Sequence, residues 1–282
     1  MDPEFHMQPL WKIDIPSIVE LSNAAFADYH VPIQFNQSSF LSFLVAMGVS
    51  WDLSRVILEG KKPAGFILIA RRGWGSRVAT MGFLPDSRNK GCGHQTLARI
   101  IDEARERGDR SIELEVITAN QPAVHIYKKS GFRIIQDLYG FKRPAGGTGQ
   151  HETLEEVDIR EVARMIASAG APDLPWQLSA ETLACYGPPM KGFQCEGAYA
   201  VISDPSQPSI AMMSLIVEPE ERGEGRATTL LRSLVSRYSE TDFTIPALCP
   251  AVFEPLFTPV GFERSELSQH HMRLDLEAVD RG

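Results

Sequence analysis

A segment near residue 90 combines glycines and cations in the manner of a phosphate-binding loop. From Met81 to Gly93 it reads MGFLPDSRNKGCG, and a run with apolar residues at helical spacing follows directly. Glycines let the backbone approach an anion closely, and the unbonded N–H groups at a helix N-terminus point toward it with a favourable dipole. We therefore expect Arg88–Gly93 to hold a phosphate group.

A second motif follows the strand-like run ELEVI that begins at Glu113. It reads NQPAVHIYKKSGF from Asn120 to Phe132. Taken with the loop, it resembles the GNAT acetyltransferase superfamily, whose loop pattern is Gln/Arg-x-x-Gly-x-Gly/Ala after a strand ending in Val-x-Pro, and whose second pattern is Asn-x-x-Ala-x-x-x-Tyr-x-x-x-Gly-Phe. The matching positions are Arg88, Gly91, Gly93, Asn120, Ala123, Tyr127, Gly131 and Phe132. Both motifs occur in order and at the right separation, which makes the resemblance specific.

The resemblance implies catalytic roles for three residues. In the members that resemble ribosomal-protein alanine acetyltransferases, a Glu in Leu-Glu-Val accepts a proton and the motif Tyr donates one; these positions are Glu115 and Tyr127, with Asn120 beside them. An amine must lose a proton before it attacks a thioester, and the leaving thiolate benefits from gaining one. We therefore expect direct transfer in a ternary complex. Glu113, on the same strand face, stays open as the alternative base.

The resemblance also implies acetyl-coenzyme A (acetyl-CoA) as cosubstrate. Three strand residues would bond the pantetheine arm like an added strand: Met81, Gly82 and Phe83. The pyrophosphate would lie against the loop and the first helical turn, and the full set of expected contacts adds Arg88, Asn89, Lys90, Gly91, Cys92, Gly93, His94, Asn120 and Tyr127. Cys92 would sit inside the phosphate cradle, so it is not expected to carry the acetyl group.

The second half of the chain repeats the pattern. The stretch VEPEERGEGRA from Val217 to Ala227 matches the loop, and FTPVGF ending at Phe262 matches the tail of the second motif. When the halves are aligned on Gly261-Phe262, the three expected catalytic positions are taken by Ile245, Pro250 and Phe257. None of these can move a proton. The second half is expected to keep a cofactor-shaped loop without this chemistry, as a scaffold or as a wall of the acceptor site.

The expected fold class is α/β (α+β), with two tandem GNAT-like domains at residues 7–146 and 150–282. Each would be a mixed, mostly antiparallel sheet flanked by helices, with the cofactor wedged where two parallel strands splay. The boundary is placed in the loop PAGGTG, 144–149, and MDPEFH at 1–6 is interpreted as a vector remnant. A helix is expected over 154–169. Tyr29 and His30 are interpreted as a surface loop, with acceptor contact as the alternative.

Composition narrows the class of partner. Residues 1–146 have a net charge of +3 and the rest −11, which together give the chain's −8. An acidic second half argues against nucleic acid, and no apolar run is long enough to span a membrane. Without a signal peptide, a cytoplasmic location is expected. The four cysteines, Cys92, Cys185, Cys195 and Cys249, lack metal-ligand spacing, so no metal is expected.

Three functions remain open from the sequence. The favoured one is N-acetylation of a primary amine on a small molecule or peptide, by a monomer or homodimer. The second is a non-catalytic protein that binds or senses acyl-CoA. The third is an enzyme whose second domain is the active one.

Overall fold

A computed structural model describes residues 5–146 and 152–276. Contacts between residues divide the chain into two compact units, 1–135 with 271–282 (unit 1) and 136–270 (unit 2). This division differs from the expected break at 146–150. Residues 147–149 of the loop taken as the boundary lie outside the described part, and its described part, from Pro144 to Gly146, belongs to unit 2.

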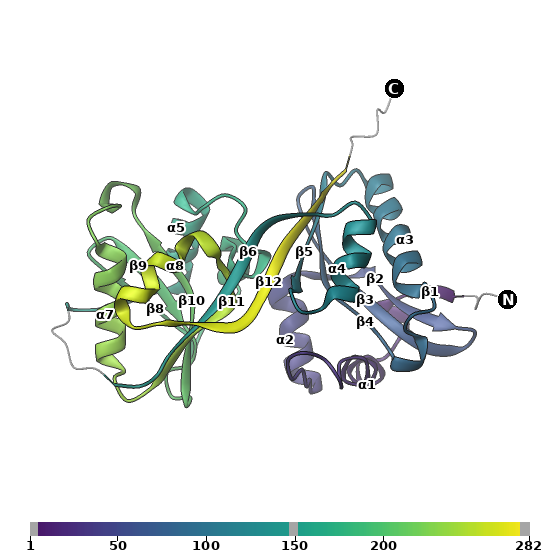
Figure 1. Ribbon diagram of the computed structural model, residues 1–282, viewed down its shortest axis with the longest axis horizontal. Coiled ribbons are helices and arrows are strands. Elements are labelled where there is room, and N and C mark those ends of the chain that lie inside the picture. The colour runs from purple at the N-terminus through teal and green to yellow at the C-terminus, as the bar shows by residue number, and fades with distance from the viewer. Residues whose placement is uncertain (1–4, 147–151, 277–282) are drawn as a thin grey trace, which may run out of the picture. The chain divides into compact units, whose positions relative to one another are not determined.

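Unit 1 is built on strands that run in the order β1-β2-β3-β4-β5, with the end of β12 after β5 (Figure 1). The strands are β1 (Phe5–Pro9), β2 (Val49–Glu59), β3 (Lys62–Arg72), β4 (Gly75–Phe83), β5 (Ser111–Ile117), the first residues of β6 (Arg133–Arg143) and the last of β12 (Glu263–Asp275). The helices are α1 (Ile15–Ala25), α2 (Gln37–Met47), α3 (Cys92–Arg107) and α4 (Gln121–Lys129). Phe5 and His6 pair with β2, so the fold begins before the expected start at residue 7.

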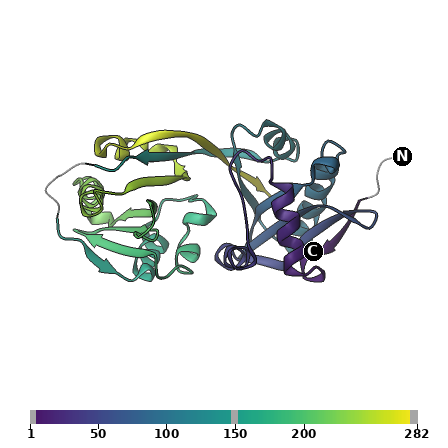
Figure 2. The same cartoon turned by 90° about the horizontal axis from the view of Figure 1, so that it is seen from below.

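Helices cover both faces of the sheet of unit 1. Alternate residues of a strand point to opposite faces, so each face presents its own apolar side chains to the helices. Phe66 and Leu68 of β3 belong to the core under α1 and α2. Ile67 and Ile69 belong to the core under α3 and α4. Figure 2 shows the chain from below, with α1 in dark purple seen from the side as it crosses the strands. This is the layered arrangement expected from the sequence.

Unit 2 repeats the same plan, with strands in the order β6-β11-β10-β9-β8-β7. Its further strands are β7 (Glu155–Val157), β8 (Lys191–Cys195), β9 (Ala198–Ile202), β10 (Ser209–Val217) and β11 (Asp242–Pro250). Its helices are α5 (Ile159–Ala169), α6 (Ala180–Leu183), α7 (Arg226–Arg237) and α8 (Glu254–Phe257). The expected helix over 154–169 is wrong at its start: β7 occupies 155–157, and Asp158 caps α5 by accepting from the Arg160 N–H at 2.9 Å.

In each unit one parallel strand pair interrupts an otherwise antiparallel series. In unit 1, β4 pairs with β5 only from Gly75 to Arg77. In unit 2, β10 pairs with β11 only from Ser209 to Ala211. Each upstream strand also carries a bulge two residues further on, at Ala79 and at Met213. The strands separate beyond these points, so both units have the splay that the sequence predicts.

Candidate functional site

The phosphate loop of unit 1 joins β4 to α3 in a conformation that only a few residue types adopt readily. Gly91, the N-cap of α3, has φ +76°, and Asn89 has φ +61°. Glycine adopts such angles readily and asparagine does so occasionally, whereas most other residues are strained there. Among the described residues, no side chain caps this helix. The N–H groups of its first turn, from Cys92 to His94, are therefore free of intrahelical partners and available to an anion.

Arg88 fastens this loop to the end of α1. Its Nε donates to the Phe83 carbonyl at 3.0 Å, and its Nη2 donates to the Ala25 carbonyl at 3.0 Å. Nη1 and Nη2 also donate to the two carboxylate oxygens of Asp28, at 2.6 and 2.8 Å. The hydrogen bond from Arg88 holds the pKa of Asp28 below its usual range. Arg88 thus acts on the loop mainly by fixing its shape, while part of its charge is already balanced.

The other loop side chains lie around this frame. Lys90 is ion-paired with Glu59 at 3.1 Å, and Asn89 and His94 are exposed. Gly93 lies in α3 beside Phe83, where a Cβ would come within 3.5 Å of the ring. The sequence-predicted loop residues are therefore brought together, and they surround the free helix terminus.

The edge of β4 beside this loop is suited to bind an extended chain. Met81, Gly82 and Phe83 pair with β3 on one side, at Ile67, Phe66 and Gly65. On the other side, the described pairing with β5 has already ended at Arg77. Backbone groups on that side are free to bond a ligand arm as an added strand. This is the place where the resemblance puts the pantetheine arm.

Glu115, the expected base, is buried in an ion pair. Its Oε2 accepts from Nε of Arg77 at 2.9 Å and from Nη2 at 2.5 Å. Both side chains are almost inaccessible, at 4% exposure for Arg77 and 2% for Glu115. Leu114 and Val116 belong to the core under α3 and α4, so Glu115 between them points to the opposite face of β5. The sequence indicated the carboxylate but not the cation that faces it.

Glu113, the alternative base, is also held by cations. Its Oε1 accepts from Arg273 at 2.9 and 2.7 Å, and its Oε2 lies 3.3 Å from His271 Nε2. Burial raises the pKa of Glu113, but hydrogen bonds from His271 and Arg273 outweigh it and leave the pKa below its usual value. Glu113 therefore anchors the end of β12, and its carboxylate is a weakened base.

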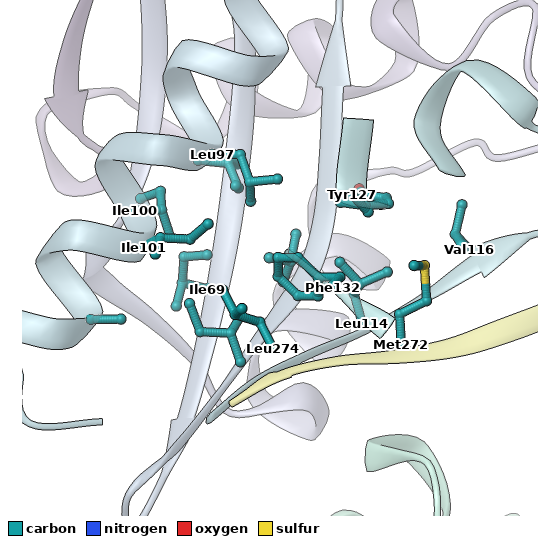
Figure 3. Close-up of a cluster of buried hydrophobic side chains, with 14 of the residues drawn as sticks. Ile69, Leu97, Ile100, Ile101, Leu114, Val116, Tyr127, Phe132, Met272 and Leu274 are labelled. Carbon is teal, nitrogen blue, oxygen red and sulfur yellow. The ribbon is translucent and has the colours of Figure 1, made fainter. Parts of the chain in front are cut away.

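Tyr127 of α4 lies inside the apolar core of unit 1. Figure 3 shows its ring beside Phe132, and the ring centroids are 5.8 Å apart. Burial is the main cause that raises its pKa well above the usual value for a phenol, with a smaller contribution from Tyr29. The phenol is thus protonated at every working pH, as a proton donor must be, and its raised pKa makes it a weaker acid than an exposed tyrosine.

Asn120 connects two elements near Tyr127. Its Oδ1 caps α4 by accepting from the Ala123 N–H at 3.3 Å, and its side chain also hydrogen-bonds Tyr29. Tyr29 is partly buried, whereas His30 is exposed. The surface-loop interpretation therefore fits His30 but not Tyr29. The sequence offered Tyr29 only as a possible acceptor contact; its contact with Asn120 was missed, because the two residues are far apart in the chain.

Cys92 is placed in the loop as expected, with its side chain in the core. The residue is 2% exposed, and burial raises the pKa of its thiol to about 11. A protonated, buried thiol is a poor nucleophile. Within the described part of the chain, no group of three His, Cys, Asp or Glu residues is arranged to hold a metal ion. None of its helices is long and apolar enough to cross a membrane.

The loop of unit 2 has the same geometry as that of unit 1. Gly225 has φ +78° and caps α7, as Gly91 caps α3. Arg222 Nε donates to the Val217 carbonyl at 3.2 Å and its Nη2 donates to the Ala169 carbonyl at 2.5 Å, which repeats the backbone contacts of Arg88. The repeat seen in the sequence is therefore a repeat of local structure.

The positions equivalent to the expected catalytic residues can be read from strand register. Arg77 pairs with Glu113 in unit 1, and Ala211 pairs with Thr244 in unit 2. Two residues further along each strand, Glu115 is therefore matched by Pro246 and not by Ile245 as expected. The alignment on Gly261-Phe262 was wrong here by one residue, because the segment from this strand to the Gly-Phe pair is one residue shorter in unit 2 than in unit 1. Pro246 has no group that can accept a proton.

Comparison with known proteins agrees with this architecture. Residues 18–132 match the model of the acetyltransferase (GNAT) family. Streptothricin acetyltransferase of Streptomyces lavendulae is 34% identical over 90 residues, which make up 31% of this chain and 42% of that protein. The chain thus aligns with less than half the length of that relative.

Two solved structures share the fold over nearly the whole chain. A GCN5-related N-acetyltransferase from Sphaerobacter thermophilus superposes with a TM-score of 0.66 and 12% identity, over 98% of this chain and 97% of that one. The tandem GNAT protein from the clavulanic acid biosynthesis pathway gives 0.65 and 14%, over 98% and 100%. At these identities the likeness is one of fold.

Proposed function

We propose that this chain is a tandem GNAT N-acetyltransferase that transfers acetyl from acetyl-CoA to a primary amine, and that unit 1, whose residues 18–132 match the family model, carries out the transfer. The observation that carries the proposal is the free N-terminus of α3 behind Gly91, next to the open edge of β4. The two features fit the two parts of acetyl-CoA, because an anion suits a helix N-terminus and the amides of an extended arm suit a strand edge.

In this proposal the residues of unit 1 have separate tasks. The backbone N–H groups of Cys92, Gly93 and His94 bind the pyrophosphate, and the backbone from Met81 to Phe83 orients the arm. Tyr127, a protonated phenol in an apolar environment, gives its proton to the leaving thiolate. Asn120 holds the start of α4, and therefore Tyr127, in place.

Removal of the proton from the amine is assigned to Glu115, with Glu113 as the alternative. Both carboxylates are negatively charged within ion pairs. An amine held beside either carboxylate passes its proton to a carboxylate oxygen, directly or through a water molecule. The amine then attacks the thioester directly, so no acetyl-enzyme forms.

The acceptor class follows from the same site and from the relatives. A small-molecule or peptide amine is proposed, and streptothricin is a rational first compound because a relative of this chain is named for acetylating it. The acidic second half would attract a cationic acceptor over a distance. If it does, the transfer rate falls as ionic strength rises; a rate indifferent to salt contradicts this steering.

The test is release of coenzyme A from acetyl-CoA in the presence of streptothricin, aminoglycosides, polyamines and peptide N-termini. Wild type is compared with Tyr127→Phe, Glu115→Gln and Glu113→Gln. Loss of one proton-transferring group lowers the rate by about 10²–10⁴-fold. A rate unaffected by Tyr127→Phe and by both glutamate variants would place the chemistry outside unit 1.

A second candidate is a non-catalytic protein that binds or senses acyl-CoA. It is favoured by the two glutamates, because each is held by a cation and Glu113 is a weakened base. This function predicts stoichiometric binding of acetyl-CoA, measured by titration calorimetry, with no coenzyme A release for any amine in the panel.

A further inference from the structure

Unit 2 contains a cavity of about 580 Å³ where β10 and β11 separate. Its walls come from the end of α5, the 3-10 turn Trp176–Leu178, β10, the loop before α7, β11 and α8. The volume falls in the range of about 300–1,000 Å³ that small-molecule sites occupy. The cavity lies inside one unit, so its shape does not depend on the other.

Charge is confined to one part of the cavity wall. The charged lining side chains are Glu221 and Arg222, in the loop that leads into α7, and Arg226, the first residue of α7. Glu221 is ion-paired with Arg226 at 3.0 Å, and Arg226 also bonds Glu196. Among the described residues no other carboxylate lines the cavity, so an amine acceptor would find no free counter-charge there.

The rest of the wall is mainly apolar. Leu174, Leu178 and Met213 line it from the α5–β10 side, and Phe253 and Leu256 line it from the α8 side. Burial of apolar ligand surface against such side chains is favourable in proportion to the area removed from water. A ligand that fits both parts of the wall has an anionic end and an apolar end.

We propose that unit 2 binds an acyl-CoA whose acyl chain is longer than acetyl and that it holds this ligand without transferring the acyl group. The N-terminus of α7 behind Gly225 receives the pyrophosphate, as the matched geometry of Gly91 and Gly225 indicates. The apolar wall receives the acyl chain. This goes beyond the proposed function, which concerns acetyl transfer by unit 1.

Ser214 offers a hydrogen-bonding group to the middle of such a ligand, between its pyrophosphate and its acyl chain. Its Oγ is buried and, among the described residues, has no hydrogen-bond partner, and Ser214 lines the cavity. A buried hydroxyl without a partner is unfavourable, and an amide of a pantetheine arm would supply one. The absence of transfer follows from Pro246 and Phe257, which occupy the positions where unit 1 has Glu115 and Tyr127 and cannot move a proton.

The test is titration calorimetry on the full chain with the phosphate loop of unit 1 blocked by Gly91→Glu, using coenzyme A, acetyl-CoA and octanoyl-CoA as probes. We expect one equivalent of octanoyl-CoA to bind at least about tenfold more tightly than either other probe, because each buried methylene adds to affinity. Equal affinities for the three, or no binding, would overturn the proposal.

Two further comparisons use matched variants and ligands. Leu178→Glu places a charge in the apolar wall and is expected to remove the advantage of octanoyl-CoA, whereas Leu178→Met is expected to keep it. Thermal unfolding checks that both variants fold. The comparison of coenzyme A, acetyl-CoA and octanoyl-CoA uses an unchanged unit 2, so it tests the proposal even if a variant fails to fold. If octanoate binds as tightly as octanoyl-CoA, the loop before α7 contributes nothing to binding and the proposal is wrong. Acetyl transfer by the wild type is measured separately, so each proposal can fail alone.

Discussion

Arg77, the last residue of β4 that pairs with β5, forms a buried ion pair with Glu115, two residues further along β5, with 2.5 Å between Nη2 and Oε2. In unit 2 the equivalent positions hold Ala211 and Pro246, and a cavity lies between the strands. Where the strands separate, unit 1 thus has a buried ion pair, whereas unit 2 has a cavity lined mainly by apolar side chains. This difference supports separate ligands for the two units.

The ion pair gives a first prediction, on stability. Glu115→Gln leaves the guanidinium of Arg77 buried without its counter-ion, so the free energy of unfolding in urea should fall by about 3 kcal/mol. The double variant Arg77→Met/Glu115→Leu should recover most of this loss, since it buries no charge. A double variant no more stable than Glu115→Gln would contradict the electrostatic explanation. If Glu115 is the base, the recovered variant is still inactive.

The phosphate loop gives a second prediction, on affinity. Gly91→Ala and Gly73→Ala both place a Cβ at a positive φ, +76° and +55°, and each should lower stability by about 1 kcal/mol. Gly73 lies in the turn between β3 and β4, away from the loop. Only Gly91→Ala should weaken acetyl-CoA binding, by about tenfold or more in a calorimetric titration. Equal affinities in the two variants would show that the loop does not bind the cosubstrate.

Glu113 gives a third prediction, on pH. Its pKa is lowered in the folded state, so its ion pairs contribute stability above the unfolded pKa of about 4.5, and this contribution is lost as pH falls. Glu113→Gln should therefore be less stable than wild type at pH 7, and the two should converge below about pH 4. Chemical unfolding across that range measures this. Glu20→Gln, at an exposed position of α1, is the control, and its stability should match that of the wild type across the whole pH range.

The thiols give a fourth prediction, on reactivity. Cys185 is exposed, whereas Cys92, Cys195 and Cys249 are buried. Burial raises the pKa of Cys92 to about 11 and that of Cys249 to about 12. Because the thiolate is the reactive form, Ellman's reagent at pH 8 should titrate Cys185 alone in the native protein, and all four thiols after unfolding. Cys185→Ser should remove the native signal; fast reaction of a second thiol would mean that a buried cysteine opens to solvent.

The sequence by itself determined the features that depend on near neighbours. Both loops could be predicted, because a helix N-terminus, a glycine with positive φ and an arginine five residues beyond a strand end are all encoded within a short segment. The helical run before Gly108 and the strand from Ser111 to Ile117 were likewise readable from periodicity. The Asn120 cap on α4 is equally local.

Only the tertiary structure decided which side chains face one another. The last residues of β12 complete unit 1 by burying Met272 and Leu274 and by bonding Glu113, a pairing of segments that are far apart in the chain. The same holds for Arg77 with Glu115 and for Tyr29 with Asn120. Strand pairing and core packing are selected by the fold as a whole, since burial has no preferred sequence distance. The sequence therefore identified the chemical groups, and the fold determined their partners and their charge states.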